Sequence, residues 1–84
     1  MNLTFTPQAW EDYQWWLEHD RKTLRRINAL IRDTLRDPFD GIGKPEPLKH
    51  VLAGAWSRRI TQEHRLVYVI AGDDLVVIQC RYHY

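Results

Sequence analysis

The sequence predicts an α+β domain in which two N-terminal helices pack on a mostly antiparallel sheet of four to five strands. Apolar residues recur at helical spacing along two stretches of the first half. Turn residues divide the second half into short segments rich in β-branched and aromatic side chains. Because a chain of 84 residues has room for one core, we expect a single domain over residues 1–84.

Two capping signals set the expected helices, which follow a short strand at residues 2–6. Thr6 is a suitable N-cap with Pro7 at the first helical position, and this helix should end at His19. Asp20 can cap a second helix, which the pair Asp37-Pro38 ends. The stripes expected to face the core are Trp10, Tyr13, Trp16 and Leu17, and then Leu24, Ile27, Ile31 and Leu35.

The second half should form strands at residues 48–53, 56–60, 65–71 and 75–84. Alternation predicts two core-facing sets, Leu66, Tyr68 and Ile70 on one strand and Val76, Ile78, Cys80 and Tyr82 on the last. A three-residue loop at 72–74 would then pair Ala71 with Leu75 and place Arg65 opposite Arg81. The side chains expected on the face away from the helices are Arg59, Arg65, Arg81 and His83.

Composition narrows the classes of function. No apolar run approaches the roughly 18 residues of a membrane span, and the N-terminus lacks the features of a signal peptide, so we expect a cytoplasmic protein. Cys80 is the only cysteine and is expected to be a small core residue. The four histidines lack the spacing of metal ligands, so we expect neither a metal nor another cofactor. Residues 48–84 carry five Lys or Arg against three Asp or Glu, which favours a phosphate-bearing partner.

Two residues can supply acid and base chemistry. Glu46 lies between Pro45 and Pro47, which hold its backbone extended, although the segment can also be read as a rigid connector. His83 titrates near neutral pH, although it can also be an incidental part of the chain end. With arginines that match a phosphodiester, these groups are the parts needed to cleave RNA through its 2′-hydroxyl. An RNA-binding module without nuclease activity is the alternative.

The segments GKPEPLKH, WSRRIT, EHRLVY and CRYHY resemble the Txe/YoeB family of RelE-type, ribosome-dependent mRNA endonucleases. The resemblance spans the chain and implies a microbial-ribonuclease-like fold, metal-independent mRNA cleavage in the ribosomal A site, inhibition of translation and neutralisation by a YefM/Phd-type antitoxin. A toxin of the same fold that acts on gyrase would need no acid and base pair, so the presence of both Glu46 and His83 counts against that activity. The roles that the resemblance implies are general base for Glu46, general acid for His83, transition-state stabilisation for Arg65, phosphate binding for Lys49 and Arg59, and substrate positioning for Tyr84.

The predicted register also leaves an apolar patch on the face away from the helices. Its expected members are Val67, Val69, Leu75 and Val77. A second copy of the chain or an antitoxin segment is the expected cover for such a patch, so a homodimer is one possible assembly.

Overall fold

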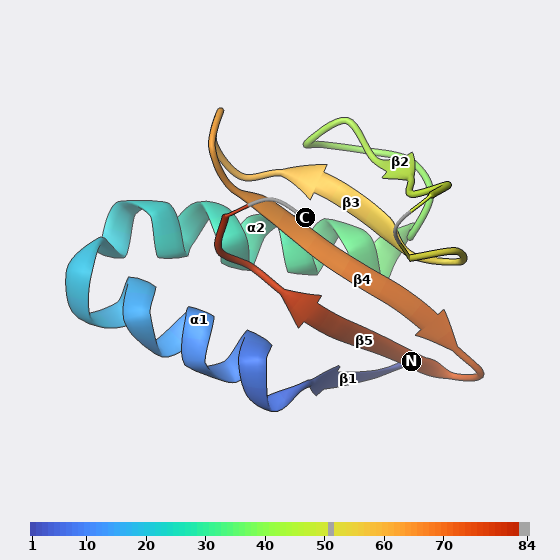
Figure 1. Ribbon diagram of the computed structural model, residues 1–84, viewed down its shortest axis with the longest axis horizontal. Coiled ribbons are helices and arrows are strands. Elements are labelled where there is room, and N and C mark those ends of the chain that lie inside the picture. The colour runs from blue at the N-terminus through green and yellow to red at the C-terminus, as the bar shows by residue number, and fades with distance from the viewer. Residues whose placement is uncertain (51, 83–84) are drawn as a thin grey trace.

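The protein folds as two helices packed on one face of a mixed sheet, which confirms the predicted fold class (Figure 1). The computed structural model describes residues 1–50 and 52–82. Within these residues the sheet has five strands in the order β1-β5-β4-β3-β2, in which β1 runs parallel to β5 and the other pairs are antiparallel. The elements are β1 (Asn2–Phe5), α1 (Pro7–His19), α2 (Arg21–Arg36), β2 (Glu46–Pro47), β3 (Trp56–Arg59), β4 (Arg65–Ala71) and β5 (Asp74–Gln79).

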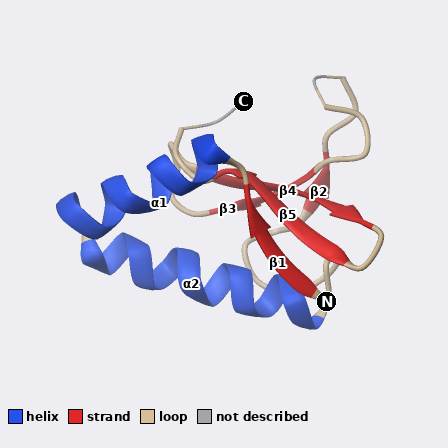
Figure 2. Ribbon diagram, turned by 90° about the horizontal axis from the view of Figure 1, so that it is seen from below, coloured by secondary structure: helices blue, strands red, loops and turns tan. Residues whose placement is uncertain are grey.

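Both helices begin where the capping residues predicted. The Thr6 hydroxyl accepts the N–H of Ala9 at 3.1 Å and donates to the carbonyl of Ile78 at 3.0 Å, so the same cap fastens α1 to β5. Asp20 accepts the N–H of Thr23 at 3.1 Å and starts α2 directly after α1. Figure 2 shows both helices on the same side of the sheet, which leaves the other face for a site.

The main core lies between the helices and the sheet. Its most buried members are Ala9, Trp16, Leu24, Ile27, Leu30, Ile31, Ile60, Leu66, Tyr68, Leu75, Val77 and Cys80. The expected stripe of α1 is only partly correct, because Trp10 is 54% exposed and Leu17 is 37% exposed. Since α1 packs beside α2 and over β5 and β1, only one side of its apolar stripe reaches the core.

The register predicted for the last hairpin is wrong by one residue. The loop contains only Gly72 and Asp73, so Ala71 pairs with Asp74 rather than with Leu75. Gly72 has φ +61°, which suits such a tight turn. A slip of one residue exchanges the two faces of a strand. The residues of β5 that join the main core are therefore Leu75 and Val77, whereas Val76 and Ile78 were expected there.

A bulge then changes the alternation again near the end of β5. Tyr68 pairs with Val77 and Val67 with Gln79, so one extra residue is inserted on β5 and Cys80 returns to the core as predicted. The expected strand at 75–84 is too long, because β5 ends at Gln79. Tyr82, expected in the core, is 57% exposed.

The strand expected at residues 48–53 is also placed wrongly. The pairing segment is the earlier β2, in which Glu46 faces Ser57 across the ladder and Pro47 faces Trp56. The described residues that follow form bends and turns, and Val51 lies outside the described part. Proline has no N–H to donate, so Pro47 is tolerated on this edge strand.

The apolar patch expected away from the helices has different members. Leu75 and Val77 belong to the main core, while Val67 is fully buried in a second, smaller cluster on the other face. Val69 and Ile78 are partly buried beside it. The loop that follows β2 contributes Leu48 and Ala55, so part of this face is covered by the chain itself.

Candidate functional site

The centre of the site is an ion pair between β2 and β4, on the face of the sheet away from the helices. An oxygen of Glu46, Oε1, lies 3.0 Å from Nη1 of Arg65. Ser57 of the intervening strand β3 pairs with Glu46, and its hydroxyl accepts a longer bond of 3.4 Å from Arg65 Nη1. Three strands therefore bring together two residues that are distant in the sequence.

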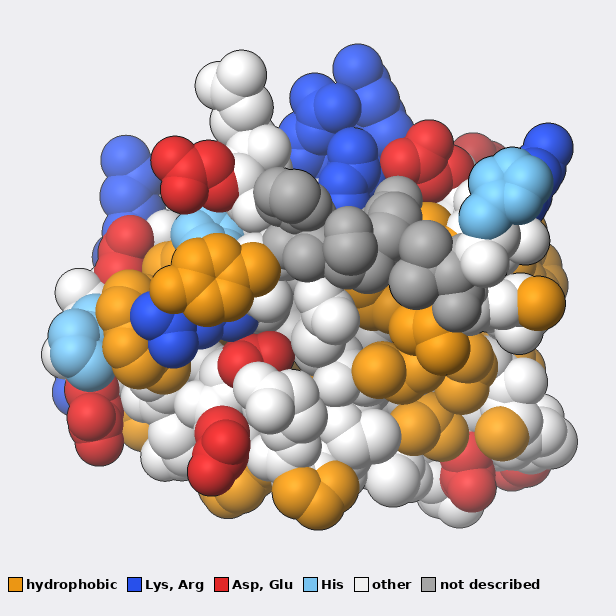
Figure 3. Space-filling model, viewed as in Figure 1, with side chains coloured by type: hydrophobic (Ala, Val, Ile, Leu, Met, Phe, Trp, Pro, Cys, Tyr) orange, Lys and Arg blue, Asp and Glu red, His pale blue; other side chains and the backbone are white. Residues whose placement is uncertain are grey.

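A second arginine lies directly opposite the first. Arg59 and Arg65 pair across β3 and β4, so the prediction that they share a face is confirmed. Directly opposed like charges destabilise a sheet, and the carboxylate of Glu46 offsets part of this repulsion. Because Glu46 is 52% exposed and Arg65 21%, this ion pair contributes little to stability, and the arrangement is better explained by a function. Figure 3 shows basic side chains gathered at one edge of this face with acidic side chains beside them.

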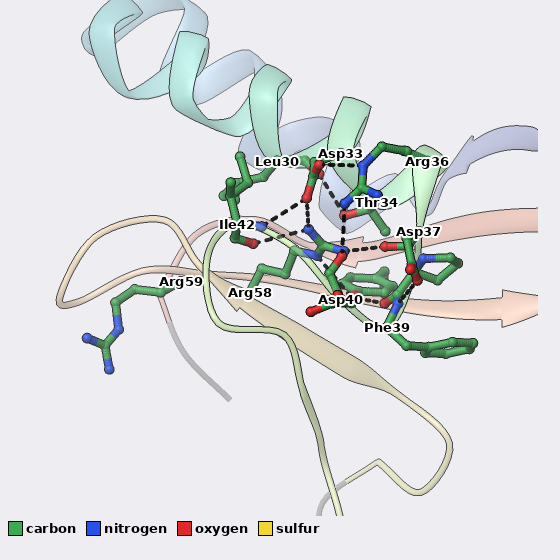
Figure 4. A network of polar contacts seen from close by, with 12 residues as sticks. Leu30, Asp33, Thr34, Arg36, Asp37, Phe39, Asp40, Ile42, Arg58 and Arg59 are labelled. Atoms are coloured by element: carbon green, nitrogen blue, oxygen red, sulfur yellow. Dashed lines mark hydrogen bonds and ion pairs between the residues drawn. The ribbon is translucent and has the colours of Figure 1, made fainter.

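The loop that leads to Glu46 is anchored by Arg58, a role that the sequence reasoning missed (Figure 4). Arg58 is fully buried and points toward α2 and the loop, whereas its neighbour Arg59 points away from them. Five hydrogen bonds leave its guanidinium. Their acceptors are Asp33 Oδ2 at 2.6 Å, the carbonyls of Ile42 at 3.1 Å, Asp37 at 2.5 Å and Asp40 at 3.1 Å, and the Tyr68 hydroxyl at 3.2 Å. The sequence held one signal for this buried position. Arg58 lies midway between Trp56 and Ile60, which both pack in or against the main core, so alternation directs the Arg58 side chain toward the core as well.

Asp33 is the anionic partner in this network. Its carboxylate accepts hydrogen bonds from Arg36, from the backbone N–H of Ile42 and from Arg58, and these hold the pKa of Asp33 at about 2. Gly43 brings the loop close to β3, because its carbonyl accepts the N–H of Arg59 at 2.7 Å. A Cβ there would lie 2.7 Å from a methyl carbon of Leu30, and the φ of +80° also favours glycine. The loop before Glu46 is therefore held through its backbone, by side chains of α2 and β3 and by the backbone of Arg59.

The segment after β5 is held by α1 and β4 rather than by strand pairing. The indole N–H of Trp16 donates to the carbonyl of Cys80 at 2.8 Å, and the N–H of Cys80 donates to Asp12 at 3.0 Å. Burial, followed by the charge of Asp12, raises the pKa of the Cys80 thiol to about 12. This buried thiol matches the prediction of a core cysteine. Farther on, the carbonyl of Tyr82 accepts the N–H of Arg65 at 2.9 Å.

Arg81 does not lie opposite Arg65 as predicted. Its guanidinium carbon is 3.7 Å from the centre of the Trp15 ring on α1 and 4.7 Å from that of Tyr82. The predicted pairing fails because the chain leaves the strand after Gln79.

The remaining predicted site residues are Lys49, His83 and Tyr84. Lys49 is exposed in the loop after β2, while His83 and Tyr84 lie outside the described residues. Across residues 1–50 and 52–82, no three His, Cys, Asp or Glu side chains are grouped so that they could hold a metal ion. Neither helix in this part of the chain is long and apolar enough to cross a bilayer.

Comparisons with known proteins agree over the whole chain. Residues 5–84 match the YoeB-like toxins of bacterial type II toxin-antitoxin systems. Toxin YoeB of Synechocystis sp. is 61% identical over 100% of this chain and 98% of its own. The solved YoeB/ParE toxin from Agrobacterium tumefaciens has a TM-score of 0.97 at 53% identity, with 100% of both chains covered. YoeB from Staphylococcus aureus, solved as a dimer and in complex with YefM, has TM-scores of 0.92 and 0.90 at 46% identity, covering 100% of this chain and 98% of its own.

The fold and these matches define a toxin of a bacterial type II toxin-antitoxin system. Within that class the chain belongs to the YoeB-like toxin family, since the family match covers residues 5–84 and the Synechocystis relative is 61% identical over the whole chain.

Proposed function

We propose that the protein is a ribosome-dependent endoribonuclease that cleaves mRNA in the A site and thereby inhibits translation. The observation that carries this proposal is the ion pair of Glu46 and Arg65, with Arg59 directly opposite Arg65. It places a carboxylate that can take a proton next to guanidinium groups that can bind a phosphodiester. The reaction needs no metal ion, because the RNA supplies its own nucleophile.

The proposed reaction is a displacement at phosphorus. The Glu46 carboxylate takes the proton of the 2′-hydroxyl, and the 2′-oxygen forms a bond to phosphorus. The bond from phosphorus to the 5′-oxygen breaks, and His83 donates a proton to that oxygen. The products are a 2′,3′-cyclic phosphate and a 5′-hydroxyl end.

Arg65 has two partners in this scheme. In the free protein its guanidinium binds Glu46 at 3.0 Å. When a phosphodiester enters, its oxygens compete for the guanidinium, which leaves the carboxylate free to take the 2′ proton. Arg65 then stabilises the charge that develops on the phosphorane, where preorganised donors have their largest effect.

The other site residues are assigned to binding. Arg59 and Lys49 would contact phosphates of the mRNA, and Tyr84 would position a nucleotide, for which a tyrosine ring offers a stacking surface. Arg81 is also proposed as a phosphate ligand, with its guanidinium stacked on Trp15.

The proposed partners are the ribosome, mRNA and a YefM-type antitoxin in the cytoplasm. The YefM complex of the Staphylococcus aureus relative supports the antitoxin, and the dimer of that relative supports a homodimer. The partly covered cluster around Val67, Val69 and Ile78 lies on the same face as the Glu46–Arg65 pair. A segment seated on this cluster would therefore also lie beside the proposed active site.

The test uses purified protein and programmed ribosomes, with cut mRNA as the readout. Glu46→Gln should lower the cleavage rate by about 10²- to 10⁴-fold with ribosome binding retained, because the carboxylate serves the transition state. Arg65→Lys keeps the charge but loses the planar fork, so we expect a loss of about 10-fold or more. The matched control is Glu18→Gln on α1, which should cleave at the parental rate.

Three outcomes would contradict the proposal. Parental cleavage by the Glu46→Gln variant would exclude Glu46 as the base. Parental cleavage by the Arg65→Lys variant would exclude a role for the planar guanidinium of Arg65 beyond its positive charge. Ribosome binding without any cut mRNA would favour the alternative, an RNA-binding toxin without nuclease activity.

A further inference from the structure

We propose that His64 is a positioning residue whose ring nitrogen Nδ1 holds the backbone of Tyr82, and with it the start of the segment that carries the acid His83. This inference rests on the proposed function. It assigns the imidazole of His64 a structural hydrogen bond in place of a direct part in proton transfer.

The central observation is a short hydrogen bond. The backbone N–H of Tyr82 donates to His64 Nδ1 at 2.6 Å. On the other side of the same residue, the Tyr82 carbonyl accepts the N–H of Arg65 at 2.9 Å. The neighbouring residues His64 and Arg65 therefore bind both polar backbone groups of Tyr82, one through a side chain and one through the main chain.

Tyr82 needs such support because its backbone is strained. Its φ is +62°, a left-handed conformation that non-glycine residues adopt rarely and at a cost. The ladder of β4 and β5 ends at Val67 and Gln79, so Tyr82 lies beyond its last pair. The two bonds from His64 and Arg65 take the place of the ladder at this point.

The ring of His64 is itself held in place. It packs edge-on against Trp16 of α1, with ring centres 4.8 Å apart and an interplanar angle of 89°. It also lies 5.4 Å from the ring of Tyr82. The turn below it is fixed, because the N–H of His64 donates to the Thr61 hydroxyl at 3.2 Å and its carbonyl accepts the N–H of Ile60 at 2.9 Å.

The acceptor role assigns a tautomer. A neutral imidazole has one protonated nitrogen and one acceptor, so acceptance at Nδ1 places the proton of His64 on Nε2. Leucine and phenylalanine offer no hydrogen-bond acceptor, and aspartate offers a charged acceptor without an aromatic ring. None of them reproduces the combination of an aromatic edge and a neutral acceptor. Asparagine retains the acceptor alone, because its Oδ1 lies at a distance from the backbone similar to that of Nδ1.

This arrangement has a consequence for the proposed reaction. Arg65 carries the cation that would stabilise the transition state, and its own N–H holds the residue that precedes the acid. Together with the His64 ring, it ties Tyr82, the residue before the proposed acid, to the same strand that presents the cation. Misplacement of a reacting group by about 1 Å can cost up to 10²-fold in rate, so loss of this tie should affect the chemical step.

The experiment compares His64→Leu and His64→Asn in single-turnover mRNA cleavage on programmed ribosomes. We expect the Leu variant to lose about 10- to 100-fold in the rate of the chemical step with ribosome affinity unchanged. The Asn variant should recover most of that rate, because it restores an acceptor for Tyr82. His19→Leu on α1 is the matched control and should behave as the parent.

A second measurement reports on the bond without activity. In ¹⁵N-labelled protein, the amide of Tyr82 should exchange with solvent faster in the Leu variant than in the parent or the Asn variant. The proposal is overturned if this exchange is the same in all three proteins, if Leu and Asn lose equal activity, or if the Leu variant cleaves at the parental rate. Failure of the proposed nuclease function would give a different result from failure of the His64 proposal. In that case the parent and the Glu46→Gln variant would cleave mRNA at equal rates, or neither would cleave it.

Discussion

Replacement of Arg58 by methionine tests the network that anchors the loop before Glu46. Arg58 is fully buried, and methionine has a similar length without the five hydrogen bonds of the guanidinium. Three loop carbonyls lose a charged donor, while Tyr68 keeps its own bond to the carbonyl of Pro38 at 2.6 Å. Removal of one partner from a buried ionic network costs about 3–5 kcal/mol of the free energy of unfolding.

That loss is large for this chain. A typical stability of roughly 0.05–0.15 kcal/mol per residue gives about 4–13 kcal/mol for a domain of 84 residues. A loss of 1 kcal/mol lowers the Tm of such a domain by roughly 4–8 °C, so Arg58→Met should lower the Tm by at least about 10 °C.

The matched control is Arg59→Met, the next residue on the same strand with the opposite orientation. Arg59 faces Arg65, so its removal relieves a like-charge contact and should change the unfolding free energy by no more than about 0.5 kcal/mol. Urea unfolding followed by tryptophan fluorescence measures both variants. We expect Arg58→Met to lose stability, and Arg59→Met to keep stability but lose mRNA cleavage. A loss below about 1 kcal/mol for Arg58→Met, or equal losses for both variants, would refute the reasoning.

Three further predictions use the same protein. The raised pKa of Cys80, about 12, together with its burial predicts that iodoacetamide near about pH 8 alkylates it only after unfolding; equal rates in native and unfolded protein would contradict this. The folded pKa of Asp33, about 2, lies below its ordinary value of 3.8, so its contribution to stability is present above 3.8 and is lost as the pH falls toward 2. Urea midpoints across that range should fall less steeply for Asp33→Asn than for the parent. Deletion of His83 and Tyr84 should abolish mRNA cleavage with little change in Tm, and a truncated protein that cuts at the parental rate would exclude His83 as the acid.

The sequence by itself determined the local features of this protein. Thr6 and Asp20 cap the two helices as predicted, because a cap depends on the few backbone groups within reach of its side chain. Alternation predicted that Arg59 and Arg65 share a face if the turn between them has an odd number of residues, and the pairing of the two residues around residues 60–64 confirms this. The carboxylate of Glu46 was also a candidate from its two flanking prolines, and the structure adds its partner Arg65.

Only the tertiary structure decided the register of the last hairpin. Residues 75–78 are all apolar, so either face can be buried and the pattern does not choose between a two-residue and a three-residue loop. Packing against the helices selects Leu75 and Val77, and the bulge then returns Cys80 to the core. Arg81 is absent from the row of Arg59 and Arg65 for another reason, because β5 ends at Gln79 before the chain reaches it.

The two anchors of the proposed site were likewise decided by the tertiary structure. Arg58 is buried because its acceptors come from α2, the loop after it and β4, which are distant in the sequence. His64 meets Tyr82 only because the chain leaves β5 after Gln79 and turns toward the aromatic side chains of α1. Both contacts join residues whose spacing along the chain carries no periodic signal, since only the folded sheet brings their segments together.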